Sequence, residues 1–184
     1  FANKLKNVKT TENINFELNL NKSYDELWQN FSKKHQASIK KSRKNNLQLS
    51  TDLKIEELIE LKKEYLPNNL NQKNFEILKL ICKKNPQKAK IYGARKNGEL
   101  LTASLYFHQD NKIYFLASVS SKNGRKYGSA FFLKDKFVEH FSNNNYILDF
   151  EGSNIPGVSH FFKGWNAKPF LYQSIKTFFL KINK

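Results

Sequence analysis

Methionine is absent from this chain of 184 residues, and cysteine occurs once, at Cys82. One cysteine excludes an internal disulfide framework, and its helical spacing from Phe75 and Leu78 predicts that it packs in a core. No run of about 18 apolar residues occurs, so the sequence predicts no membrane-spanning helix. We also expect no signal peptide and a cytoplasmic location.

Metal-ligand and nucleophile motifs are missing as well. The histidines are scattered, at His35, His108, His140 and His160, and with a single cysteine they form no metal-ligand spacing. No serine or cysteine nucleophile motif occurs. We therefore expect no metal site and no covalent enzyme intermediate.

Acidic residues are scarce: the chain has 16 of them and 32 lysines and arginines, which gives a net charge of +16. Such a charge is typical of proteins that bind a polyanion such as nucleic acid. However, the only arginines are Arg43, Arg95 and Arg125, and arginine is the residue that phosphate-reading surfaces favour. A solvated lysine-rich surface and a functional basic surface both remain open.

The chain starts at Phe1 rather than at methionine, and we expect it to be part of a longer protein whose N-terminal domain is missing. Residues 1–13 are polar and lack periodicity, so we expect a linker from that upstream region. Residues 14–184 have the length of a single domain with its own core.

Hydrophobic periodicity predicts alternating groups of strands and helices. The predicted strands cover residues 14–20, 47–50, 89–95, 100–108, 113–119, 146–150 and 170–182, the last as one long or two short strands. The predicted helices begin at the capping box Ser23-x-x-Glu26 and cover residues 33–46, 54–66, 71–84, 130–142 and 155–165. This order predicts an α+β fold with a central mixed antiparallel and parallel sheet flanked by helices.

The stretch from Ile113 to Ala130 changes from a strand to a helix through a loop that contains glycine. Ile113, Phe115, Ala117 and Val119 alternate with their neighbours and are predicted to share one face of the strand. The helix N-terminus that follows attracts anions, and Gly128 lets the backbone approach a phosphate closely. An ordinary strand-to-helix connection is the alternative interpretation.

Two carboxylates, Asp149 and Glu151, follow a buried strand that we expect to be parallel to its neighbour. Sites in α/β sheets tend to lie at the carboxyl ends of such strands. The two residues are separated by one position, which predicts that they share a face while Phe150 points into the core. Either carboxylate is a candidate general base, and an ion pair or helix cap at the strand end is the alternative.

The pattern Arg125-x-x-Gly128-x-Ala130 resembles the Q/R-x-x-G-x-G/A loop of the GNAT N-acyltransferases, and the element order resembles the GNAT fold. The resemblance implies that strands 113–119 and 146–150 splay apart to accept an acyl group. It also implies a donor site for the pyrophosphate of acyl-coenzyme A, a co-substrate rather than a tightly bound cofactor. That site would comprise Val119, Arg125, Tyr127, Gly128, Ser129 and Ala130.

Two further segments resemble the C-terminal half of the Fem-like (FemABX) transferases. Residues 23–47 match at Ser23, Leu27, Trp28, Phe31, Ile39, Lys40, Lys41 and Leu47, while His35 or Gln36 replaces an expected arginine. Residues 162–167 are similar to the F-K-x-F-G-A motif, although Trp165 and Asn166 depart from it. The resemblance implies that Lys163 stabilises charge near the reaction centre, and a solvated helix residue is the alternative. From their chemistry, Tyr127 and Tyr172 are candidate general acids, with aromatic packing as the alternative.

The resemblance therefore implies an N-acyltransferase that moves an acyl or aminoacyl group from acyl-coenzyme A or aminoacyl-tRNA to an amine. The expected acceptor is a small molecule or a cell-wall precursor, and tRNA is an expected partner of the aminoacyl version. The alternative is a non-catalytic half of a two-domain Fem-like protein that holds an acidic acceptor or tRNA.

Overall fold

The computed structural model describes residues 8–66, 71–152 and 154–177. Its helices are α1 (Tyr24–Asn30), α2 (Lys33–Arg43), α3 (Ile55–Tyr65), α4 (Gln72–Lys84), α5 (Lys122–Tyr127), α6 (Ser129–Phe141) and α7 (Pro156–Gly164). Its strands are β1 (Val8–Asn19), β2 (Gln48–Ser50), β3 (Ala89–Lys96), β4 (Glu99–Gln109), β5 (Lys112–Ser120), β6 (Ile147–Asp149) and β7 (Lys168–Thr177). Element types therefore follow the predicted order, apart from α5.

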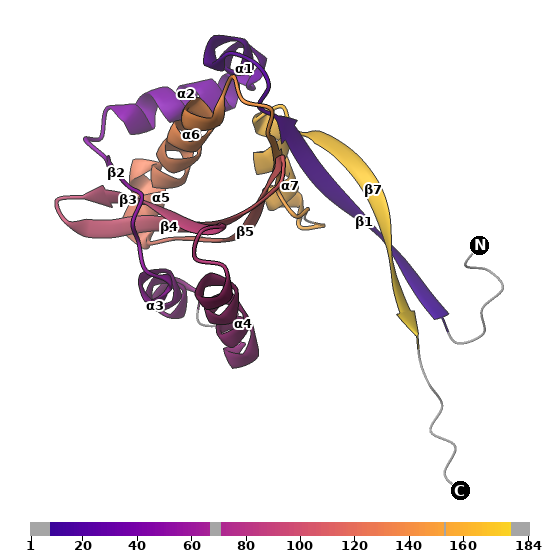
Figure 1. Ribbon diagram of the computed structural model, residues 1–184. Coiled ribbons are helices and arrows are strands. Elements are labelled where there is room, and N and C mark those ends of the chain that lie inside the picture. The colour runs from indigo at the N-terminus through magenta and orange to yellow at the C-terminus, as the bar shows by residue number, and fades with distance from the viewer. Residues whose placement is uncertain (1–7, 67–70, 153, 178–184) are drawn as a thin grey trace, which may run out of the picture.

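The described strands form one sheet in the order β2-β3-β4-β5-β6-β1-β7. The pair β5–β6 is parallel, and the other neighbouring pairs are antiparallel. In Figure 1, α3 and α4 cover one face of the sheet, α1, α2 and α6 lie on the other, and β1 and β7 extend from the body as a twisted ribbon. This confirms the predicted mixed sheet flanked by helices.

Local sequence signals account for several element boundaries. The capping box forms at α1, where Ser23 accepts from the amide of Glu26 and the Glu26 carboxylate accepts from the amide of Ser23. Asn97 and Gly98 both have positive φ, as the tight turn between β3 and β4 requires. Pro156 opens α7, where its missing N–H costs no intrahelical bond.

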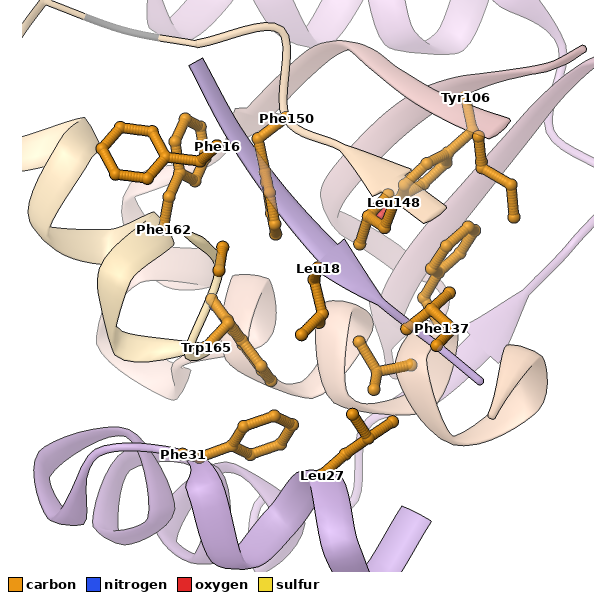
Figure 2. Packing of buried hydrophobic residues seen from close by; sticks show 14 of the residues in the cluster. Phe16, Leu18, Leu27, Phe31, Tyr106, Phe137, Leu148, Phe150, Phe162 and Trp165 are labelled. Carbon is orange, nitrogen blue, oxygen red and sulfur yellow. The ribbon is translucent and has the colours of Figure 1, made fainter. Parts of the chain in front are cut away.

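The two largest hydrophobic clusters lie on the two faces of the sheet. The larger one joins β1, β4, β5 and β6 to α1, α6 and α7, and Figure 2 shows Phe16, Phe150 and Phe162 meeting within it. The smaller one packs Leu58 and Leu61 of α3 against β3, β4 and β5. The central strands are therefore buried on both faces, as expected of a sheet between two helical layers.

The Phe162–Ala167 segment is held by close packing against α2. A Cβ atom on Gly164 would lie 1.9 Å from the His35 ring, so only glycine fits there. The His35 ring donates from Nε2 to the carbonyl of Phe161 over 2.9 Å. Asn166 has φ +60°, the left-handed conformation that asparagine tolerates.

The two ends of the domain differ from the prediction. Residues 8–13 belong to β1 and pair with β7, so the linker predicted for residues 1–13 is wrong over this part, and residues 1–7 lie outside the described residues. A two-stranded ribbon buries little surface, so its residues can be polar. Residues 8–13 therefore lack the hydrophobic alternation from which a strand is predicted. β7 is one strand that ends at Thr177, and residues 178–184 lie outside the described residues.

The predicted loop between β5 and α6 is mostly a short helix, α5. The Ser121 side chain accepts from the amide of Gly124 over 2.9 Å and so caps this helix. Gly128, at φ +69°, ends α5 and starts α6. The sequence interpretation missed the serine cap and assigned the whole segment to a loop.

A β-bulge divides β5 into two halves. Tyr106 of β4 pairs with Phe115 and Leu105 pairs with Ala117, so Leu116 is the extra residue. Phe115 consequently lies in the larger core, whereas Ala117 and Val119 face the smaller core. The prediction that Ile113, Phe115, Ala117 and Val119 share one face is therefore wrong.

Candidate functional site

The strands β5 and β6 part soon after they meet. Their parallel pairing covers only Lys112–Tyr114 against Ile147–Asp149, and β5 continues to Ser120. The chain after β6 turns away because Glu151 and Gly152 both have positive φ, at +58° and +70°. A Cβ atom on Gly152 would lie 2.3 Å from the carbonyl oxygen of Ile14, so this turn requires glycine.

The parting strands leave a cavity of about 600 Å³, which we call the interstrand pocket. It is lined by Lys62, Phe115, Leu116, Ala117, Ser118, Phe150, Glu151, Gly152, Gly157, Val158, Phe161 and Phe162. Most of this lining is apolar, and Lys62 and Glu151 are its charged members. A small apolar group with a polar end fits such a cavity.

Glu151 lies exposed at the interstrand pocket. Partial desolvation raises the pKa of its carboxyl group, the nearby Asp149 charge raises it further, and Lys112 acts in the opposite direction. A carboxylate with a raised pKa is a better proton acceptor near neutral pH than an ordinary one. Glu151 is therefore the candidate proton acceptor of the interstrand pocket.

Asp149 is buried and bound on both carboxylate oxygens. Its Oδ1 accepts from Asn15 Nδ2 over 2.9 Å and from the Glu151 amide over 2.8 Å, and its Oδ2 lies 3.4 Å from Lys112 Nζ. It does not line the interstrand pocket. The prediction that Asp149 and Glu151 share a face is wrong because the left-handed Glu151 interrupts the strand.

A second cavity, the basic pocket, lies between α2 and the α5–α6 junction. It is lined by Ser38, Lys41, Ser42, Arg125, Lys126, Tyr127, Gly128 and Phe131. Arg125 donates from Nη1 to the carbonyl of Ser120, the last residue of β5, over 3.0 Å. Three cations next to the start of α6 make this cavity attractive to an anion.

Three other residues expected at a donor site lie elsewhere. Val119 is buried in the smaller core, and the Ser129 hydroxyl is bonded to Thr102 Oγ1 over 2.5 Å inside the protein. Ala130 lines neither pocket. The side chains of Val119 and Ser129 are therefore buried away from a ligand in the described structure, whereas Ala130 is partly exposed outside both pockets.

The other predicted catalytic residues do not line the interstrand pocket, where Glu151 lies. Lys163 is exposed on α7, with its Nζ 5.9 Å from the centre of the Phe16 ring, and it lines neither pocket. Tyr172 is exposed on β7, and Tyr127 lines only the basic pocket. The described structure thus brings no predicted general acid to the interstrand pocket.

A pair of aromatic rings connects the two pockets. Phe131 lines the basic pocket, Phe161 lines the interstrand pocket, and their ring centres lie 5.2 Å apart. A ligand that reaches from one pocket to the other would pass over these rings.

Sequence reasoning missed Lys62, Phe115, Ser118 and Phe161 as members of the pocket. Lys62 belongs to a lysine-rich helix, and nothing in the local sequence distinguishes it from Lys63. Ser118 donates to the carbonyl of Ala103 over 3.2 Å and is bonded to Ser104 over 2.8 Å. Only the packing of α3 and α7 against β5 reveals which of these side chains reach the cavity.

Among the described residues, no group of three or more histidine, cysteine or acidic side chains is placed to hold a metal ion. In the same part of the chain, no helix combines the length and apolar character needed to cross a membrane.

No protein-family model and no curated protein sequence matches this chain. Several solved structures are similar to it. FemX superimposes with a TM-score of 0.69 at 12% identity, over 85% of this chain and 59% of that one. L-PGS from Bacillus licheniformis gives 0.61 at 12% identity, over 92% and 62%. A putative GNAT-family acetyltransferase from Novosphingobium aromaticivorans gives 0.51 at 9% identity, over 92% and 67%.

The fold is therefore GNAT-like and resembles that of Fem-like transferases. At these identities the similarity extends to the fold. The chain spans about three fifths of the length of FemX and of L-PGS, at 59% and 62%.

Proposed function

We propose that this domain transfers an acyl or aminoacyl group from an activated donor to an amine acceptor. The donor is acyl-coenzyme A or aminoacyl-tRNA, and the acceptor is a small molecule or a cell-wall precursor. The observation that carries the proposal is the interstrand pocket, a cavity between parted strands with Glu151 at its edge. The GNAT-like fold of the chain supports the same reaction class.

The reaction is an aminolysis of a thioester or an ester. The amine nitrogen attacks the carbonyl carbon, a C–N bond forms, and the C–S or C–O bond to the carrier breaks. Glu151 accepts a proton from the amine, and the departing sulfur or oxygen is protonated from the attacking nitrogen or from solvent. Beyond Tyr114 the edge of β5 has no β6 partner, and backbone N–H groups on such an edge polarise a carbonyl.

The two pockets divide the donor between them. The phosphates of coenzyme A, or of the tRNA 3′ end, bind at Arg125, Lys126 and Lys41 in the basic pocket. The rest of the donor crosses Phe131 and Phe161, and the acyl group enters the interstrand pocket. Charge thus selects the carrier, and the apolar cavity holds the group that is transferred.

Donor binding tests the first half of this proposal. We expect calorimetry to detect coenzyme A or aminoacyl-tRNA at low salt, with affinity falling as salt rises. Arg125→Ala should weaken binding by about tenfold, because it removes one charge-assisted contact. Lys83→Ala, an exposed position on α4, is the charge-matched control. A domain that binds neither donor, or that loses equal affinity in both variants, contradicts the proposal.

Turnover tests the second half. Glu151→Gln should lower the transfer rate by about a hundredfold or more and leave donor affinity unchanged, since only the proton acceptor is lost. Transfer that persists at the original rate would remove Glu151 from the mechanism.

A non-catalytic binding half is the second candidate. It is favoured by the positions of Lys163, Tyr127 and Tyr172, which lie away from Glu151 in the described structure. Saturable binding of tRNA or of an acidic acceptor, with no transfer from either donor, would select this alternative.

A further inference from the structure

Lys62 lines the interstrand pocket without a counter-ion. It lies on α3, half-buried, and no carboxylate among the described residues forms an ion pair with it. Residues 1–7, 67–70, 153 and 178–184 contain no aspartate or glutamate. None of the acidic side chains of this sequence therefore neutralises Lys62.

A half-buried ammonium without a partner has lost water and gained no compensating charge. Burial accordingly lowers the pKa of Lys62, and no neighbouring charge contributes to that shift. An anionic group that enters the pocket would supply the missing interaction, and its own negative charge would be stabilised in turn. Lys63, the next residue on the same helix, is exposed and has no such position.

The second charged group of the cavity has the opposite sign and lies apart from Lys62. Glu151 also lines the interstrand pocket, yet the two side chains form no ion pair. Desolvation, Asp149 and Lys112 shift the pKa of Glu151, and Lys62 does not contribute to that shift. Apolar side chains of β5 and α7, including Ala117 and Val158, line the same cavity.

One cavity therefore holds, among apolar side chains, a cation and a carboxylate that form no ion pair with each other. Such an arrangement is complementary to a molecule that carries an amine at one end and a carboxylate at the other. We propose that the acceptor is of this class, an amino acid or the amino-acid end of a larger molecule, with its amine at Glu151 and its carboxylate at Lys62. This inference rests on the proposed function and narrows its acceptor.

The acceptor enters as an ammonium and transfers one proton to Glu151. The neutral amine attacks the donor carbonyl, the C–N bond forms, and the C–S or C–O bond breaks. The second amine proton passes to the departing thiolate or alkoxide. Lys62 takes no part in these proton transfers, so it is a specificity residue.

Matched acceptors test the assignment. ω-Amino acids of two to six carbons are compared with n-alkylamines of the same chain length, with the acyl or aminoacyl donor that the binding experiment selects. We expect the best amino acid to exceed its alkylamine at least tenfold in kcat/KM. The chain length of that optimum reports the spacing between Lys62 and Glu151.

Three variants separate charge from packing. Lys62→Met should bring the ratio of amino acid to alkylamine close to one, Lys62→Arg should restore most of it, and Lys63→Met should leave it unchanged. If Lys62→Met lowered kcat/KM equally for the amino acid and the alkylamine, the inference would be overturned, because Lys62 would then act on the donor carbonyl. An unchanged ratio in Lys62→Met would overturn it as well.

Calorimetry with the acceptor alone distinguishes the two proposals. 5-Aminopentanoate should bind at least tenfold more tightly than pentylamine, and Lys62→Met should abolish that difference. If this holds but neither donor supports transfer, the transferase proposal fails and the assigned ligand class stands. If transfer to simple amines proceeds but no amino acid of the series binds better than its alkylamine, the inference fails and the transferase proposal stands.

Discussion

Replacing Lys134 by methionine should stabilise the protein. Lys134 of α6 is 3% exposed, and its Nζ has no hydrogen-bond partner among the described residues. The Nζ lies 3.4 Å from the centre of the Phe115 ring and 4.9 Å from that of Phe150. Burial lowers the pKa of this amine well below its ordinary value of 10.5. The folded protein therefore holds this amine, with no hydrogen-bond partner among the described residues, behind two rings of the interstrand pocket.

The magnitude follows from two separate costs. An unbonded polar group in an apolar site costs about 1–3 kcal/mol, which methionine of similar volume removes. In addition, the lowered pKa means that the folded chain binds a proton at Lys134 less readily than the unfolded chain does. Wild-type stability therefore rises with pH, by about 1.4 kcal/mol per unit between the folded pKa and the unfolded value near 10.5. Methionine has no such dependence.

Urea unfolding at pH 7, 8 and 9 measures both costs. We expect Lys134→Met to be more stable than wild type, with an advantage that shrinks from pH 7 to pH 9 by up to about 2.7 kcal/mol, the limit set by about 1.4 kcal/mol per pH unit. Lys136→Met, on the same helix and more exposed, controls for the loss of a lysine and should show no such trend. An advantage that does not vary with pH would refute the reasoning, since Lys134 would then be charged in both states.

Three further predictions concern Gly152, Asp135 and Glu151. Gly152→Ala should lower the free energy of unfolding by about 2 kcal/mol or more, because φ is +70° and the added Cβ meets a carbonyl. Gly157→Ala is the control, since it has open space around it and should not lower that free energy. Equal effects of the two variants in urea unfolding would contradict this prediction. Asp135→Asn should cost about 3 kcal/mol, since this buried carboxylate accepts two bonds from Arg43, at 2.8 and 3.0 Å; a change below about 1 kcal/mol would oppose that view. If Glu151 is the base, kcat should fall as pH drops through its raised pKa, above the ordinary 4.5, and a rate profile that stays flat down to pH 4.5 would exclude it.

The fold was largely predictable because its signals are local. The capping box at Ser23, the Asn97–Gly98 turn and Pro156 depend on residues close in sequence, and each has the predicted local structure. The meander of three antiparallel strands follows from short turns, which leave no room for a crossover. The ends of β1 and β7 were not predictable in this way, because their pairing depends on a partner more than a hundred residues away.

The candidate site was predictable only in part. The parting of β5 and β6 matches what the resemblance implied, and Glu151, a candidate from its place at a strand end, lines the resulting pocket. The local pattern could not separate Asp149 from Glu151, because the positive φ at Glu151 breaks the alternation that the pattern assumed. It also could not place Lys163 or Ser129, whose surroundings come from distant segments.

The amino-acid sequence by itself determined the kinds of elements apart from α5, their order and the start of a helix after Gly128, because propensity, capping and turn chemistry act over a few residues. Tertiary structure decided that β1 lies between β6 and β7 and that Leu116 forms a bulge. It also decided which lysine side chains are buried away from solvent. Lys62, Lys63 and Lys134 are the same residue type on amphipathic helices. Only long-range packing leaves Lys63 in solvent, brings Lys62 to a pocket and encloses Lys134 among aromatic rings.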